Sequence, residues 1–138
     1  MEIIVTDERD ERFQELCSSF GCSITEPHVV LLLMNFGKTA GCTSFKVYDE
    51  DSAEITTLFL NSKDNREKIA YKLLRQLEKI AIDYEFKNVY VSFDSREDIL
   101  IEIFEKLDYH FVEESEEVLM KKEFKSLIYS FFGKVYTL

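Results

Sequence analysis

The residues best suited to chemistry form a short charged segment just before the longest helical pattern of the chain. Four cationic side chains stand here against two carboxylates, so the segment carries a net charge of +2 in a chain of net charge −10. These residues are Lys63, Arg66, Lys68, Lys72, Asp64 and Glu67. A helix N-terminus presents unpaired N–H groups and partial positive charge, which attract anions. The segment is therefore either an anion-binding site or an ordinary solvated helix start with mixed charges.

Cysteine and histidine side chains form no recognisable metal-binding or nucleophilic pattern. Cys17, Cys22 and Cys42 are odd in number and lack a C-x-x-C spacing, which argues against a disulfide framework and a zinc site. Reduced thiols in a cytosolic protein fit this usage. No motif ties Cys42 to a histidine or an acid, so a structural role is the better interpretation. His28 and His110 are too isolated for a triad, and no metal is expected.

The net charge and the lengths of the apolar runs limit which molecules the protein can bind. A chain of 138 residues with net charge −10 lacks the basic face of a generic nucleic-acid binder. An acidic surface favours cationic partners such as amines, polyamines or basic protein tails, although it also serves simple solubility. The N-terminal acids do not form a basic signal-peptide region, and the longest apolar run, 29–34, is too short for a membrane span. We expect a cytoplasmic protein that does not contact a membrane.

Apolar periodicity predicts the elements that position these groups. Short apolar or alternating runs bounded by turn signals predict strands at 1–5, 29–35, 40–48, 53–60, 88–93, 109–113 and 117–123. Helical spacing predicts helices near 13–20, 69–84 and 95–107. Two pairs with capping-box spacing predict helix starts: Asp64 with Glu67, and Ser95 with Asp98. A meander of three strands, followed by a strong helix and another strand, implies a mixed sheet covered by helices.

Four strings in this order and spacing resemble the GNAT superfamily of N-acetyltransferases. They are GKTAGCTSF, AEITTLFLNSKDNREKIAYKLL, IEIFEKLDYHF and LMKKEF. The resemblance covers residues 1–124 and implies an α/β (α+β) fold, in which three or four helices flank a mostly antiparallel sheet of about six or seven strands. Residues 125–138 form an aromatic tail, which we expect to pack on the domain or on a partner chain, as in a homodimer.

The resemblance implies acetyl-CoA as cofactor, with its pyrophosphate at the start of the second helix. The family pattern is Q/R-x-x-G-x-G/A, whose glycines let the backbone approach the phosphates. Ala70 fits the last position, but Asn65 and Lys68 replace the Gln or Arg and the first glycine, which implies a weakened loop. Side-chain contacts from Arg66 or Lys68 could compensate. The implied cofactor-binding residues are Leu58, Phe59, Leu60, Arg66, Lys68, Ile69, Ala70 and Tyr71.

The catalytic groups that the resemblance implies are incomplete. The fourth strand would offer a bulge and a backbone N–H at Leu58–Leu60 to the thioester, independently of side-chain identity. Glu54 occupies the position of a glutamate base, or it is an exposed or paired strand residue. Phe104 replaces the tyrosine acid and has no proton to give, so water or another hydroxyl would have to protonate the thiolate. Tyr71 and Tyr109 lie in relevant stretches without an assignable role.

The sequence and the family resemblance leave two possible functions. The first is an acetyl-CoA-dependent N-acetyltransferase that transfers the acetyl group directly to a cationic amine on a small molecule or a protein. Ala70, Glu54 and the ungapped strand-to-helix spacing favour it. The second is a catalytically impaired GNAT-fold protein that binds or regulates, favoured by Lys68 and Phe104.

Overall fold

The computed structural model describes residues 1–61 and 65–124, and the tail at 125–138 lies outside the described residues. Within these described ranges, seven strands and three helices follow one another in the order that the sequence pattern predicted. In chain order they are β1 (Glu2–Asp7), α1 (Glu11–Ser19), β2 (Val29–Asn35), β3 (Lys38–Asp49), β4 (Ser52–Leu60), α2 (Arg66–Asp83), β5 (Asn88–Asp94), α3 (Asp98–Lys106), β6 (His110–Glu114) and β7 (Glu117–Glu123). None of the helices within the described ranges has the length and apolarity to cross a membrane.

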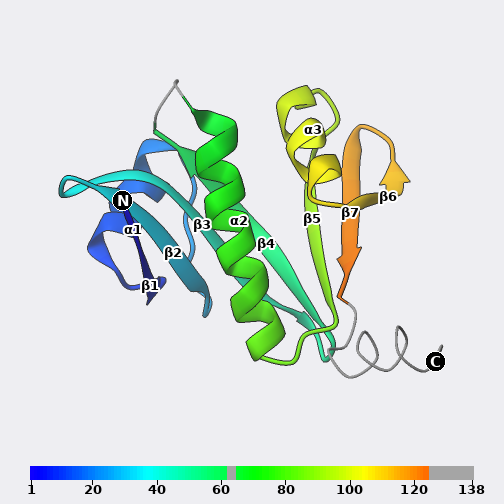
Figure 1. Cartoon of the computed structure of the whole chain (residues 1–138), viewed down its shortest axis with the longest axis horizontal. Helices are drawn as coiled ribbons and strands as arrows, with labels where there is room; N and C mark the ends of the chain where they lie inside the picture. Colours follow the sequence, from blue (N-terminus) through cyan, green and yellow to red (C-terminus); the bar gives the residue numbers. More distant parts are fainter. Residues whose placement is uncertain (62–64, 125–138) are drawn as a thin grey trace, which may run out of the picture.

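All seven strands join one sheet in the order β1-β2-β3-β4-β5-β7-β6. Each neighbouring pair is antiparallel except β4 and β5, which run parallel because α2 connects them as a crossover. The predicted mixed, mostly antiparallel sheet is therefore confirmed. Figure 1 shows β4 and β5 together at one end of the sheet and diverging toward the end where α2 and α3 begin.

The two faces of the sheet carry separate cores, because successive side chains of a strand point to opposite faces. Leu31 and Leu33 of β2 belong to the core that α2 and α3 cover. Val30 and Leu32 belong to a second core, which α1 covers with the fully buried Phe13. In Figure 1, α2 crosses in front of the sheet along its length. The start of α2 thereby lies at the end of the sheet where β4 and β5 separate.

The starts of α2 and α3 differ from the predicted capping boxes. Asn65 is the N-cap of α2, with a left-handed φ of 62° and no side-chain cap hydrogen bond, while Asp64 lies outside the described residues. The prediction of a helix starting at Ser95 is wrong, because α3 starts at Asp98. The Asp94 carboxylate accepts from the backbone N–H of Arg96 at 2.8 Å and from its guanidinium, so this segment forms a turn before the helix.

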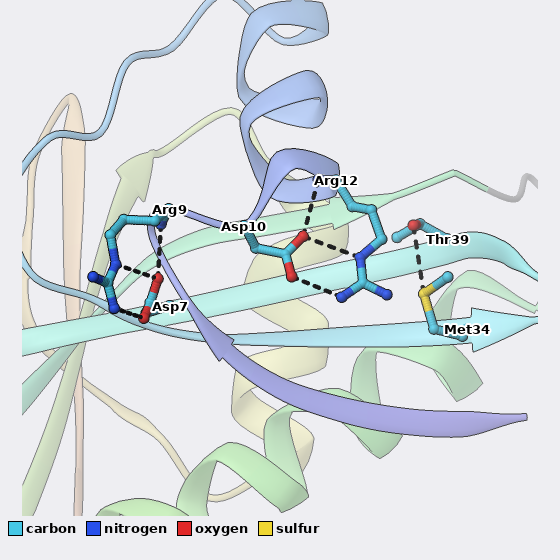
Figure 2. Close-up of polar contacts among 6 residues, drawn as sticks. All are labelled: Asp7, Arg9, Asp10, Arg12, Met34 and Thr39. Atoms are coloured by element: carbon cyan, nitrogen blue, oxygen red, sulfur yellow. Dashed lines mark hydrogen bonds and ion pairs between the residues drawn. The ribbon is translucent and has the colours of Figure 1, made fainter.

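Among the helices that the structure describes, α1 has the best capped start. The Asp10 carboxylate accepts from the backbone N–H of Arg12 at 2.9 Å and from the Arg12 guanidinium at 3.0 and 2.7 Å. Figure 2 shows this fork beside the similar one between Asp7 and Arg9. The hydrogen bond from the Arg12 side chain is the main cause that lowers the pKa of Asp10 to about 2.

Asp10→Ala is therefore expected to lower the free energy of unfolding by about 1–2 kcal/mol at pH 7. Because the folded state lowers the pKa of Asp10 from 3.8 to about 2, its contribution is complete above pH 4 and is lost as the pH falls toward 2. Urea unfolding of the wild type and the variant between pH 7 and pH 2.5 measures the difference. A difference that stays constant over this range would contradict the role of the ionised carboxylate.

Candidate active site

The candidate site begins where the parallel pair of strands separates. β4 and β5 pair from Ser52 with Asn88 to Ile55 with Val91, and no pairing continues beyond this in the described ranges. A cavity of about 200 Å³ opens there between the two strands and α3. It is lined by Ile55, Thr56, Thr57, Leu58, Phe59, Val91, Ser92, Phe93, Leu100 and Phe104. The walls are mostly apolar, which suits a thioester and its aliphatic arm.

β4 carries a bulge at the mouth of this cavity. The register with β3 passes from Phe45 opposite Ile55 to Ser44 opposite Thr57, so Thr56 is an extra residue. A bulge bends its strand and increases the local twist, which fits the separation of β4 from β5 at this point. The bulge lies two residues before the stretch Leu58–Leu60 that the resemblance indicated.

Hydroxyl groups gather at the bulge. The Ser44 Oγ lies 2.9 Å from the Thr56 Oγ1 and 2.6 Å from the Thr57 Oγ1. Thr56 also donates to the backbone oxygen of Ser44 at 3.3 Å, and Thr43 donates to the backbone oxygen of Thr57 at 2.8 Å. Ser44 and Thr43 are fully buried, so each needs these partners. A polar network therefore reaches from inside the sheet to the cavity wall.

A second, larger cavity lies at the start of α2. Its volume is about 640 Å³, and it is lined by Asn65, Arg66, Glu67, Lys68, Tyr71 and Ile99. Ile99 belongs to α3, the helix that supplies Leu100 and Phe104 to the first cavity. The two cavities therefore share α3 as one wall. In the second cavity, cationic side chains lie beside a helix N-terminus, an arrangement that suits an anion.

Comparison with known proteins identifies the family. The model of the acetyltransferase (GNAT) family matches residues 2–109. The chain belongs to this family. Curated protein sequences give no match.

Solved structures of GNAT proteins share the fold. The aminoglycoside 6'-N-acetyltransferase from Enterococcus faecium has a TM-score of 0.70 at 14% identity, over 89% of this chain and 97% of its own. The ribosomal-protein-S18-alanine N-acetyltransferase from Escherichia coli has a TM-score of 0.72 at 11% identity, over 91% and 96%. A GNAT acetyltransferase from Elizabethkingia anophelis, solved with acetyl-CoA bound, has a TM-score of 0.67 at 13% identity, over 88% and 98%. At these identities the likeness concerns the fold.

Within this GNAT domain, the residues expected to bind cofactor divide into three groups. Leu58 and Phe59 line the first cavity, and the lining of the second includes Arg66, Lys68 and Tyr71. The remaining ones are Leu60, Ile69 and Ala70, whose side chains pack into the core. Ile69 and Ala70 are buried, so only their backbone could meet a cofactor, whereas Leu60 is partly exposed.

Glu54 stands apart from the first cavity. It pairs across the sheet with Lys46 of β3 and Tyr90 of β5, in the part of β4 that is flanked on both sides. Its buried neighbours Ala53 and Ile55 face the core beneath α2, so the Glu54 side chain faces the opposite side of the sheet. A proton transfer to Glu54 from a group in the cavity would therefore run through water.

Phe104, which the resemblance matched to the GNAT tyrosine, lies in the wall of the first cavity. It is 1% exposed and stacks on Phe93 with a centroid distance of 5.8 Å. Tyr109 meets its edge at 5.0 Å, and burial raises the pKa of the Tyr109 phenol well above its usual value. The Tyr109 side chain is not part of the cavity lining, so its phenol does not supply an acid there.

The cysteines gather on the α1 side of the sheet although they are distant in sequence. Cys17 and Cys42 are buried in the same core and Cys22 packs against it, and all three are free thiols. Burial raises the pKa of Cys17 and of Cys42 to about 12. Both thiols are therefore protonated at neutral pH and poor nucleophiles. Among the described residues no His, Cys, Asp or Glu cluster could hold a metal ion.

Sequence reasoning missed two parts of the site. One is the hydroxyl network of Ser44, Thr56 and Thr57, and the other is Lys106 of α3, which pairs with Glu67 of α2 at 3.6 Å. The Lys106 pair offsets the negative charge of Glu67 beside the second cavity. A signal for the bulge was present, because the core-facing residues of β4 step by two and then by three, from Ile55 to Leu58.

Proposed function

We propose that this GNAT protein transfers the acetyl group of acetyl-CoA directly to a primary amine. The observation that carries the proposal is the pair of hollows sharing α3, one between the separated strands and one at the cationic start of α2. The thioester would enter the first hollow, and the pyrophosphate would lie at the second. The fold likeness to a GNAT structure with acetyl-CoA bound supports this placement.

The chain supplies several groups for binding. The Arg66 and Lys68 side chains would contact the phosphates, together with backbone N–H groups at Ile69–Tyr71. The backbone at Leu58–Leu60, which has no strand partner toward β5 in the described ranges, would bind the thioester carbonyl. Lys68 replaces direct backbone approach with a side-chain contact, so affinity would depend on its charge.

The acceptor would be a cationic amine. The chain has a net charge of −10, which attracts cations and raises their local concentration. Glu54 would act as a base through water and convert the ammonium into the neutral amine that attacks the thioester. We propose a cytoplasmic location, consistent with free cysteines, and a homodimer in which residues 125–138 take part.

Binding of CoA and acetyl-CoA, measured by calorimetry, tests this function. Lys68→Glu is expected to weaken CoA binding about tenfold or more, because it reverses a charge beside the phosphates. Lys79→Glu, the same change further along α2 and away from both lined cavities, is the control and should bind as the wild type does. No binding at millimolar CoA would refute the proposal.

A measurement of turnover distinguishes the two candidate functions. One is an acetyltransferase, and the other is a GNAT-fold binding protein without activity, which Phe104 favours. The protein is incubated with acetyl-CoA and one of three amine probes, spermidine, kanamycin or a basic peptide. The rate at which the free thiol of CoA is released measures acetyl transfer. Glu54→Gln should lower the rate and leave CoA affinity unchanged. Tight CoA binding without acetylation of any of these amines would favour a protein that binds cofactor in a regulatory role.

A further inference from the structure

We propose that the Thr56 hydroxyl protonates the departing thiolate and is itself reprotonated from the attacking amine. This inference rests on the proposed function and names the group that takes the role left open by Phe104. Within the lining of the first cavity, three side chains carry an exchangeable proton: Thr56, Thr57 and Ser92. The remaining side chains there are hydrocarbon.

Two of these three hydroxyls have their proton committed elsewhere. Ser92 donates to the Glu117 Oε1 at 2.5 Å, which directs its proton toward β7. Thr57 is 7% exposed and lies 2.6 Å from the Ser44 Oγ. Thr56 is half-buried at the bulge, so its side chain lines the cavity while its hydroxyl is bound to the network.

The three hydrogen bonds of the network can coexist in one proton arrangement only, because each hydroxyl has a single proton. Thr56 donates to the backbone oxygen of Ser44, so its Oγ1 must accept from the Ser44 Oγ. Ser44 has then spent its proton, so Thr57 must be the donor in the bond between them. Protons therefore point along the chain from Thr57 through Ser44 to Thr56.

This order leaves the Thr56 proton as the one that can turn into the cavity. Its hydrogen bond to the backbone oxygen of Ser44 is the longest of the three, at 3.3 Å, so it is the weakest and breaks most easily. The bond that Ser44 donates, at 2.9 Å, can remain. That donor stabilises negative charge on the Thr56 oxygen, and the donor behind it strengthens the effect.

The transfer step balances without any further acid. The nitrogen lone pair of a neutral amine forms a bond to the thioester carbon, and the carbon–sulfur bond breaks with its electron pair left on sulfur. Thr56 gives its proton to that sulfur while its oxygen takes a proton from the acylated nitrogen. The products are an amide and a thiol, and Thr56 ends as it began.

Two measurements test this role of Thr56: the affinity for CoA and the rate of acetyl transfer. Both compare the wild type with Thr56→Val, Thr56→Ser and Thr39→Val. Thr39 is a matched control, because it is a hydroxyl on β3 whose contact is the Met34 sulfur, outside the first cavity. Calorimetry at pH 9 compares CoA with desulfo-CoA, which lacks the thiol. The wild type, Thr56→Ser and Thr39→Val should bind CoA about threefold to tenfold more tightly than desulfo-CoA, and Thr56→Val should bind the two equally.

The second readout is acetyl transfer to the best of the three amine probes. Thr56→Val should lower kcat about 100-fold and change the KM for acetyl-CoA less than threefold, whereas Thr56→Ser should keep most of the activity. Thr56→Val that still prefers CoA over desulfo-CoA, or that keeps wild-type kcat, overturns the role of Thr56. In that case CoA binding by the wild type leaves the proposed function intact, and absence of CoA binding refutes both.

Discussion

Gly41→Val is expected to unfold the domain or to lower its free energy of unfolding by more than about 3 kcal/mol. A Cβ at Gly41 would lie 3.0 Å from the Ile69 Cγ2, 3.2 Å from the Leu73 Cδ1 and 3.0 Å from the backbone oxygen of Phe59. The first two atoms belong to α2 and the third to β4, so a larger side chain would push apart the helix and strand that bound the candidate site. Urea unfolding followed by circular dichroism measures the loss.

Two other glycine variants separate crowding from backbone strain. Gly41→Ala adds the Cβ alone and should cost about 1–3 kcal/mol, less than Gly41→Val. Gly37 has a φ of 76° and no atom within 4 Å of an added Cβ, so Gly37→Ala should cost about 1 kcal/mol through strain only. Equal costs for Gly41→Val and Gly37→Ala would show that the contact with α2 does not limit the fold.

The fold was largely readable from sequence because local patterns determine it. The apolar run at 29–35, the alternation at 40–48 and the helical stripe at 69–84 predicted β2, β3 and α2, and short turns predicted antiparallel neighbours. Helix starts were less readable. At α3, the Asp94 carboxylate bonds to the N–H two residues on and competes with the capping box that Ser95 would form, so the helix begins later.

Residues of the candidate site could be predicted from the sequence only where they belong to the segments that resemble the GNAT family. Arg66, Lys68 and Leu58 were expected there and line the two cavities. The hydroxyl network was missed because Ser44 and Thr56 are 12 residues apart and meet through the register of β3 with β4. A bulge changes that register by one residue, and single-residue shifts follow from packing between strands more than from local composition.

Contacts that join distant segments were also beyond local patterns, and the ion pair between α2 and β7 is the strongest example. Lys122 lies 44 residues from Glu78, and its Nζ is 2.9 Å from the Glu78 Oε1. The Glu78 side chain is 10% exposed, and its second oxygen has no hydrogen-bond partner within the described structure. Lys122 also lies over the Tyr109 ring at 5.8 Å. Lys122 is thus the cation that compensates a buried carboxylate.

Lys122→Met should therefore lower the free energy of unfolding by about 2–3 kcal/mol, because it leaves the Glu78 charge buried and unpaired. Lys87→Met is the control, since Lys87 and Asp51 are 3.7 Å apart and both exposed, and it should change stability by less than about 0.5 kcal/mol.

The double variant Glu78→Met with Lys122→Met decides whether the pair itself stabilises the fold. Removing both charges leaves no buried ion, so its stability should lie within about 1 kcal/mol of the wild type and above that of Lys122→Met. Urea unfolding of the four proteins completes the cycle with Glu78→Met. If the double variant is as unstable as Lys122→Met, the lysine stabilises through its contact with Tyr109 and the buried charge is not the cause. If it recovers, the pair adds little net stability, and the loss in Lys122→Met comes from the unpaired Glu78 charge.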